Sequence, residues 1–360
     1  MTVASEVMEA IETIAPPVLA EGWDNGGMQV GDGASTVSRI LVALTPLPEV
    51  FDEAEETGAD FVLFHHPLIF GGLDRIDANA YPGDLVFRAV RAGISVYAAH
   101  TSYDAAPDGV SVALAEALGL EGFSAPVVPR GELRKLVVFV PSENADEIAA
   151  GLSGAGAGVI GDYTQCTFRA QGVGTFLPGE GSDPYLGTRG HLERVDEVRL
   201  ETVVPAHLAS AAVGAATAAH PYEEVALDVY PVEGHPEGCG YGRIGTLREP
   251  MTPEGLRDHV SERLGFPPRL VSNPEPERSV ERVAVLGGSG GSFLRAVAAA
   301  GADAYVTGDL DYHDALLAES LGLCALDAGH AATELPALEP LARRLAELAD
   351  VPVDVSRVRR

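Results

Sequence analysis

Histidine and carboxylate side chains occur in three clusters, and each cluster soon follows an apolar run that predicts a buried strand. These runs are residues 61–64, 94–99 and 323–326. The polar residues that follow them are His65, His66, Asp104, His330 and Glu334. Neutral imidazoles and carboxylates are common ligands of zinc, iron and manganese. A histidine pair alone is more often hydrogen-bonded than metal-bound, but three such clusters together predict a metal site.

This donor set suits two divalent ions, because a carboxylate can bridge two ions and an imidazole normally does not. Pro67 disfavours a helical conformation at His66, so both rings of the pair can stand at the strand end and each could serve a different ion. His330 and Glu334 are four residues apart and share a helix face if a helix begins near Ala331. A solvated helix start is the alternative. An incomplete protein shell leaves room for water, as a catalytic metal site requires.

His100 precedes Asp104 by four residues, as His330 precedes Glu334. This internal symmetry suggests that His100 is a sixth ligand. The alternative is that His100 orients Asp104 from outside the ligand set.

Asp309 and His313 form another pair four residues apart and could act as general acid and base beside the metals. The alternative is a helix cap at Asp309 with an incidental histidine.

A glycine-rich segment at 287–291 lies between an expected strand and an expected helix. The backbone amides of Gly288, Ser289 and Gly290 could bind a phosphate there. The dinucleotide fingerprint and the P-loop lysine are both missing, which favours a tight, closely packed turn. Trp23, the one tryptophan, precedes a turn sequence and is expected in the core, with a role in lining a cleft as the alternative.

Alternating strands and helices in both outer segments predict a mostly parallel α/β sheet in each. The segment at 58–63 matches that at 301–306, and each is followed by a polar cluster. We therefore expect two related lobes that face each other, with ligands at the carboxyl ends of the strands.

The middle segment has a different pattern, close to the β-α-β-β-α-β order of ferredoxin-like domains. The predicted organisation is a first lobe at 1–127, an inserted α+β domain at 128–238 and a second lobe at 239–360.

Composition excludes several classes of protein. The chain has 360 residues, of which 24 are basic and 53 acidic, and the net charge of −29 argues against binding to nucleic acid. Three widely spaced cysteines make a disulfide framework improbable. No signal peptide or apolar run of about 18 residues is present, so we expect a cytoplasmic protein that does not enter the membrane.

The outer segments resemble the family of GTP cyclohydrolase 1 type 2 homologues, also called NIF-three-like dinuclear metal-centre proteins. The matching residues are those at 23–31, 65–70, 100–106, 241–245, 287–291 and 307–309, with Gly329, His330 and Glu334. The resemblance implies a two-metal centre in a two-lobed α/β fold that assembles as a toroidal homohexamer. The ligands that it implies are His65, His66, Asp104, His330 and Glu334, with Glu334 bridging and His100 just outside the set.

The middle segment resembles the PII/CutA-like insertion found in longer members of that family. Residues 219–224 are typical of this insertion, in which His220 is expected to be structural.

Two classes of function agree with these observations. The first is a metal-dependent hydrolase that acts on a nucleotide or phosphoester, with two zinc, iron or manganese ions; the family name points to GTP ring opening. The second is a non-enzymatic regulatory or interaction protein whose metal site and inserted domain serve binding or sensing. Substitution of Asp104 or Glu334 by alanine distinguishes the two classes, because an enzyme would lose turnover whereas a binding protein would keep its partner.

Overall fold

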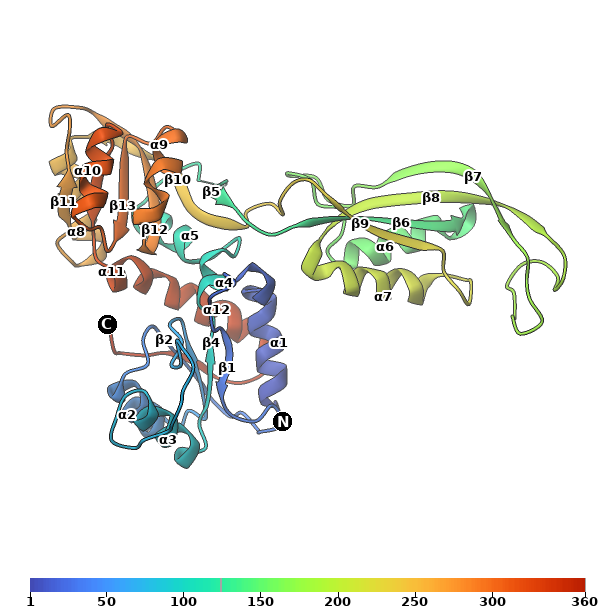
Figure 1. The fold of residues 1–360 in the computed structure, drawn as a ribbon, viewed down its shortest axis with the longest axis horizontal. Coiled ribbons are helices and arrows are strands. Elements are labelled where there is room, and N and C mark those ends of the chain that lie inside the picture. Colours follow the sequence, from blue (N-terminus) through green and yellow to red (C-terminus); the bar gives the residue numbers. More distant parts are fainter. Residues whose placement is uncertain (124, 360) are drawn as a thin grey trace. The chain divides into compact units, whose positions relative to one another are not determined.

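The computed structural model describes residues 1–123 and 125–359, which form two compact units (Figure 1). The first unit combines Met1–Pro129 with the chain from Gly238 onward, and the second is Arg130–Glu237. The second unit corresponds closely to the inserted domain expected at 128–238. Within the described part of the chain, no helix combines the length and the apolarity needed to cross a membrane.

The first unit contains two sheets, one with four adjacent parallel strands and the other with three. The first sheet has the order β1-β4-β3-β2-β15, and only β1 is antiparallel to its neighbour. Its central strands β2 and β3 are entirely apolar and buried because helices cover both faces. The strands are β1 (Gly27–Val30), β2 (Ile40–Ala43), β3 (Phe61–Phe64), β4 (Ser95–Ala98) and β15 (Val353–Val355).

Alternate residues of the first sheet face different helices. Ile40 and Val42 pack in the cluster formed with α1 and α12, whereas Leu41 and Ala43 pack in the cluster formed with α2 and α3. Each fully buried side chain of this kind contributes about 1.5–3 kcal/mol of burial free energy. The helices are α1 (Ala4–Ile14), α2 (Pro48–Thr57), α3 (Gly83–Ala92) and α12 (Leu338–Leu348).

The second sheet has the order β11-β14-β13-β12-β10-β5, with β12, β13 and β14 parallel. Helices α5 and α8 cover one face, and α9 and α10 cover the other. The strands are β5 (Pro126–Pro129), β10 (Gly240–Met251), β11 (Arg269–Ser272), β12 (Val280–Ser289), β13 (Ala304–Gly308) and β14 (Cys324–Asp327). The helices are α5 (Val110–Ala117), α8 (Pro253–Leu264), α9 (Leu294–Ala299) and α10 (Tyr312–Ser320).

The two sheets share a local hydrogen-bonding arrangement, which supports a common origin of the two lobes. The Asp60 carboxylate, just before β3, accepts hydrogen bonds from the amides of Ser38 and Arg39. Asp303, just before β13, accepts equivalent bonds from the amides of Glu281 and Arg282. In both lobes the outer antiparallel strand also pairs with the third parallel strand, β1 with β4 and β11 with β14.

The lobes exchange elements, so they do not divide at residues 127 and 239 as expected. Strand β5 and helix α5 pack in the second lobe although they precede the insertion. Conversely, α12 and β15 return to the first lobe, where β15 pairs with β2. The buried Glu53 carboxylate fixes this last segment by binding the Ser356 hydroxyl at 2.6 Å and the Arg357 amide at 3.1 Å.

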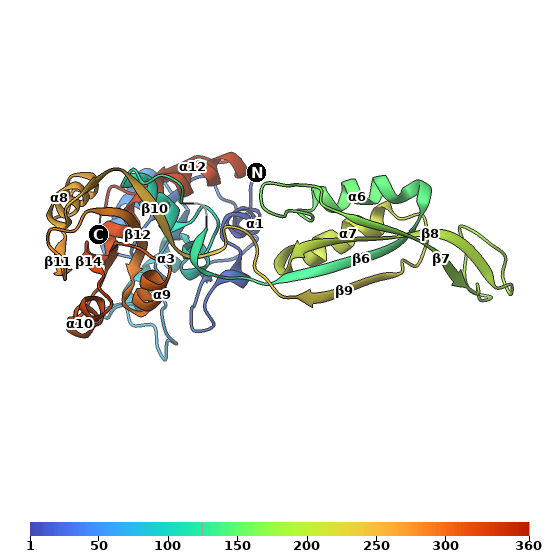
Figure 2. The ribbon, with the colours of Figure 1, turned by 90° about the horizontal axis from the view of Figure 1, so that it is seen from above.

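The second unit has the predicted element order β6-α6-β7-β8-α7-β9 and an antiparallel sheet of order β7-β8-β6-β9. Helices α6 and α7 lie on the same face of this sheet (Figure 2) and share its apolar core. The elements are β6 (Leu133–Pro141), α6 (Ala145–Gly154), β7 (Phe168–Phe176), β8 (Glu193–Pro205), α7 (Ala209–Ala219) and β9 (Leu227–Val232).

Candidate metal centre

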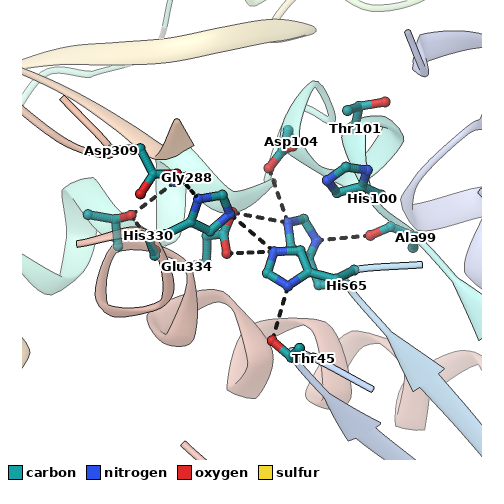
Figure 3. Close-up of polar contacts among 12 residues, drawn as sticks. Thr45, His65, Ala99, His100, Thr101, Asp104, Gly288, Asp309, His330 and Glu334 are labelled. Carbon is teal, nitrogen blue, oxygen red and sulfur yellow. Dashed lines mark hydrogen bonds and ion pairs between the residues drawn. The ribbon is translucent and has the colours of Figure 1, made fainter. Parts of the chain in front are cut away.

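The carboxyl ends of parallel strands from both lobes of the first unit bring the predicted ligands together (Figure 3). His65 and His66 directly follow β3. Asp104 ends the short helix α4 (Thr101–Asp104), which begins just after β4. His330 and Glu334 are the first and last residues of α11 (His330–Glu334), which follows β14. Helix α11 therefore begins at His330 itself, and its single turn directs both side chains to the same place.

Each of four imidazoles is held through its Nδ1 atom. His65 Nδ1 lies 3.0 Å from the Ala99 carbonyl oxygen, and His66 Nδ1 lies 3.1 Å from the Thr45 hydroxyl. The other two rings bind carboxylates, His100 to Asp24 at 2.8 Å and His330 to Asp309 at 2.6 Å. Carbonyl and carboxylate oxygens only accept hydrogen bonds, so in three rings Nδ1 must carry a proton. This arrangement orients Nε2 as the metal-binding atom, as outer partners of metal-bound histidines do.

The Nε2 atoms converge on the two oxygens of Glu334. His330 Nε2 lies 3.2 Å from Oε1, and His66 Nε2 lies 3.0 Å from Oε2. His65 Nε2 lies 3.5 Å from both Glu334 Oε1 and Asp104 Oδ1. The Nε2 atoms of His66 and His330 are only 3.3 Å apart. In this position a proton on His330 Nε2 can be donated to His66 Nε2, and a cation bound between the two rings would take the place of that proton.

Three of the converging atoms are buried without a hydrogen-bond partner, namely His65 Nε2, Asp104 Oδ1 and Glu334 Oε2. Buried polar atoms are almost always satisfied, so these three atoms are suited to binding a further group. Three sets of donor atoms have the spacing that a metal ion needs. They are His65 with His66 and His100, His66 with His330 and Glu334, and His65 with Asp104 and Glu334. The residues present therefore fit a cation, and Glu334 belongs to two of the sets.

Without a metal, the carboxylates strongly alter the protonation of the imidazoles. Burial lowers the pKa of His65, but Asp104 and Glu334 outweigh that effect and raise it to about 9. The hydrogen bond to Glu334 raises the pKa of His330 to about 9. Burial lowers the pKa of His66 and raises that of Asp104 to about 6. Burial would also raise the pKa of Glu334, but the nearby imidazoles of His330 and His65 hold it well below its usual value. Cation binding must therefore displace protons from His65 and His330.

Asp24 is a buried partner of the site that the sequence analysis did not identify. Its side chain is 1% exposed and accepts hydrogen bonds from His100 Nδ1 and from the Thr101 amide and hydroxyl. Burial opposes ionisation, but these bonds lower the pKa of Asp24 to about 2. His100 is thus held by Asp24. The sequence analysis expected His100 to be a metal ligand or to orient Asp104, and neither expectation included this contact. The one sequence feature that pointed to Asp24 was its place in the segment at 23–31, which matches the family.

Two exposed aromatic rings lie beside His100. Trp23 is 60% exposed and Phe70 is 61% exposed, so the expectation that Trp23 lies in the core is wrong. The Trp23 ring lies 6.0 Å from the rings of both Phe70 and His100. The Asn25 and Gln29 side chains bind the backbone of Ile69 and so fix the segment that carries Phe70.

Asp309 and His313 have separate positions. Asp309, which has a positive φ of 54°, supports His330 and does not cap a helix. Asp311 caps α10 instead, accepting bonds from the amides of His313 and Asp314. The His313 imidazole is exposed and packs against Tyr312, so it does not take part in the polar contacts of the site.

The glycine-rich segment packs closely against the site. The Gly288 amide donates to Thr333 Oγ1 at 2.9 Å, and the Gly290 amide donates to the Gly308 carbonyl at 3.3 Å. These two amides are therefore not available to a phosphate. A Cβ atom at Gly288, whose φ is +72°, would lie 2.5 Å from Glu334 Oε1. Glycine is thus required at 288 because the Glu334 carboxylate lies over it.

Comparison with known proteins finds the same family along the whole chain. The family model described as Duf34/NIF3 (NGG1p interacting factor 3) matches residues 2–360. A Bacillus subtilis protein named GTP cyclohydrolase 1 type 2 homolog is 40% identical over 333 residues, covering 92% of this chain and 88% of that protein. The Mycobacterium tuberculosis protein of the same name is 40% identical over 341 residues, with the same coverage.

Solved structures agree with this assignment. A Bacillus cereus protein related to NIF3 superimposes with a TM-score of 0.89 at 40% identity, covering 99% of this chain and 97% of that one. A Staphylococcus aureus protein superimposes with a TM-score of 0.75 at 28% identity, also covering 99% and 97%. The resemblance noted from the sequence motifs and the α/β prediction are both confirmed.

Proposed function

Because this chain belongs to the Duf34/NIF3 family and gathers imidazoles and carboxylates around one glutamate, we propose that it holds two divalent metal ions. His65, His66, Asp104, His330 and Glu334 would be the ligands, with Glu334 shared between the ions. The observation that carries this proposal is the convergence of oriented Nε2 atoms on both oxygens of Glu334, together with three buried atoms that lack partners. Zinc, iron and manganese all accept this ligand set.

The proposed activity is metal-dependent hydrolysis of a nucleotide or phosphoester. Divalent ions supply electrophilic polarisation of the substrate and activation of water. The chain itself supplies a water- or substrate-binding group in His100. With Nδ1–H bound to Asp24, the Nε2 atom of His100 can accept a hydrogen bond, and Asp24 fixes the direction of that bond. This role needs no change of ligand at either ion.

Trp23 and Phe70 favour a substrate that contains a nucleobase. Large exposed aromatic rings beside a polar site are suited to stacking on a base, and each stacked base contributes about 1–3 kcal/mol. Their position beside His100 would place the base next to the ligand cluster. The relatives named GTP cyclohydrolase 1 type 2 homolog agree with a purine nucleotide as the first substrate to test.

Metal analysis followed by a substrate screen tests this proposal. Nucleotides and simple phosphoesters are offered to the metal-loaded protein, with and without a chelator. We expect turnover of a nucleotide that the chelator abolishes and added metal restores. The Trp23→Ala variant should raise the KM for a nucleotide about tenfold and leave that for a phosphoester without a base unchanged. Phe87→Ala, which alters an exposed ring on α3, is the matched control. Turnover that a chelator does not affect would contradict the proposal.

A regulatory role is the second candidate, and the inserted unit favours it because that unit has its own core and cavity. We propose that the insertion is a PII/CutA-like domain and that the protein assembles as a cytoplasmic homohexamer without binding nucleic acid or membrane. Sedimentation velocity tests the assembly. If the Asp104→Ala variant loses metal but keeps a partner captured by the wild-type protein, the regulatory role is supported over catalysis.

A further inference from the structure

The second unit contains a cavity of about 670 Å³ on the sheet face opposite α6 and α7. Its floor includes Phe139, Glu197 and Arg199, which alternate along β6 and β8 with residues that face the helices. The connection between β7 and β8 and the segment that follows α7 supply its walls. All lining residues belong to this unit, and the volume lies within the usual range of about 300–1,000 Å³ for small-molecule sites.

The Glu197 carboxylate is the polar centre of this cavity. Glu197 is only 8% exposed, and among the described residues its carboxylate accepts one hydrogen bond, from the Tyr222 hydroxyl at 3.1 Å. No ion pair in the described part of the chain involves it, since Arg199 pairs with Glu201 and lies over the Phe139 ring. A Cβ atom at Gly174 would lie 2.0 Å from Glu197 Oε2, so glycine at 174 makes room for the carboxylate. The Glu197 carboxylate lines the cavity, so it is placed to be the counter-charge of a bound cation.

Aromatic rings surround this charge. The Tyr222 ring lies 6.0 Å from that of Phe176 and 6.1 Å from that of Tyr185. His220 fixes Tyr222, because its Nδ1 accepts the Tyr222 amide proton at 3.1 Å while Nε2 donates to the Phe139 carbonyl at 3.0 Å. His220 is therefore a structural residue, as its motif implied.

The same motif also fastens the wall of the cavity and makes the lining acidic. The Glu223 carboxylate accepts the Asp183 amide at 2.9 Å and so ties the β7–β8 connection to the segment after α7. Glu223 and Glu224 line the cavity together with Glu197, and Arg199 is the only basic residue among the lining residues. The charge of the lining is thus negative.

We propose that the inserted unit binds a small organic cation in this cavity, an ammonium compound with an apolar body. Glu197 would provide the counter-charge, and Phe176, Tyr185 and Tyr222 would provide apolar and cation–π contacts. The site is separate in sequence and in fold from the metal ligands. Binding at this cavity and binding of metal can therefore succeed or fail independently.

Calorimetric titration of the full-length protein tests the proposal with two cationic probes, phenethylammonium and benzyltrimethylammonium, and one neutral probe, 2-phenylethanol. The wild-type protein should bind at least one cation tenfold or more tightly than the neutral probe. Glu197→Gln keeps an acceptor for Tyr222 and should reduce this preference to less than twofold. Glu147→Gln changes an exposed carboxylate on α6 and should leave the preference intact.

A second variant fills the cavity without changing its charge. A Cβ atom at Gly172 meets no atom within 4 Å, so Gly172→Val is expected to fold and to abolish binding of all three probes. Absence of cation binding to the wild-type protein, or an unchanged preference in Glu197→Gln, would overturn the proposal. Sedimentation velocity adds one more decisive outcome. If Gly172→Val changes the oligomeric state and no cation binds the wild-type protein, the cavity is an interface between copies of the chain.

Discussion

Replacement of Asp24 by asparagine tests how the site controls His100. In the wild-type protein, Oδ1 accepts bonds from His100 Nδ1 and the Asn25 amide, both at 2.8 Å, while Oδ2 accepts the Thr101 amide at 3.0 Å and the Thr101 hydroxyl. Asparagine keeps one oxygen and turns the other position into a donor. If the oxygen stays with Thr101, the new NH₂ group faces His100 and forces the ring proton from Nδ1 to Nε2.

The magnitude follows from the bonds that are lost. One buried donor left unsatisfied costs about 1–3 kcal/mol, a large share of the roughly 5–15 kcal/mol that stabilises a typical domain. A misdirected imidazole no longer offers its acceptor to water or substrate and should lower turnover about tenfold, as the loss of one hydrogen bond of about 1–1.5 kcal/mol does. Metal content should stay the same, because in our proposal Asp24 and His100 lie outside the ligand set.

Nitrogen-15 NMR of the imidazoles reports the tautomer of His100 directly and does not require a known substrate. Urea unfolding gives the change in stability, and elemental analysis gives the metal content. Asp350→Asn, which alters an exposed carboxylate near the C-terminus, is the matched control. A His100 ring that stays protonated on Nδ1 in Asp24→Asn, together with a stability change below about 0.5 kcal/mol, would refute the reasoning.

Three further predictions concern other parts of the first unit. The affinity of the metal-free protein for metal should rise with pH up to about 9, because the pKa values of His65 and His330 are raised to about 9. Metal uptake should also release protons. A pH-independent affinity in calorimetry would contradict this prediction. Arg243 is 1% exposed and donates to four backbone carbonyls. Arg243→Met should therefore lower the free energy of unfolding, measured in urea, by about 3–5 kcal/mol. A loss below about 1 kcal/mol would contradict this prediction. Gly288→Ala places a methyl group against Glu334 and should reduce bound metal by at least half, whereas unchanged metal content would show that the carboxylate can move away.

Local patterns were sufficient to predict that these histidine and carboxylate side chains lie close together. His65, His66 and His330 each follow a continuous apolar strand, and strand ends in parallel sheets gather on one edge. The distance of four residues between His330 and Glu334 also fixed their relation on one helical turn. These features depend on short stretches of sequence, where periodicity is informative.

Contacts between distant segments could not be predicted in this way. Asp24 is 76 residues from His100 and looks like part of a turn, so its carboxylate gave no sign of its partner. Strand β15 has only three residues, and no local pattern specifies that it pairs with β2 rather than with the second sheet. Trp23 was expected in the core on account of its residue type, although tertiary contacts leave it exposed beside Phe70.

The number of ions bound per chain tests the central claim most directly. Elemental analysis of the purified protein, combined with anomalous scattering from its crystals, gives both the count and the positions. We predict two ions per chain within the cluster of His65, His66, Asp104, His330 and Glu334, and the loss of both in Glu334→Gln. Glu347→Gln, at an exposed position on α12, should keep both ions. Fewer than two ions in the wild-type protein under every metal tested, or full occupancy in Glu334→Gln, would contradict the proposed dinuclear centre.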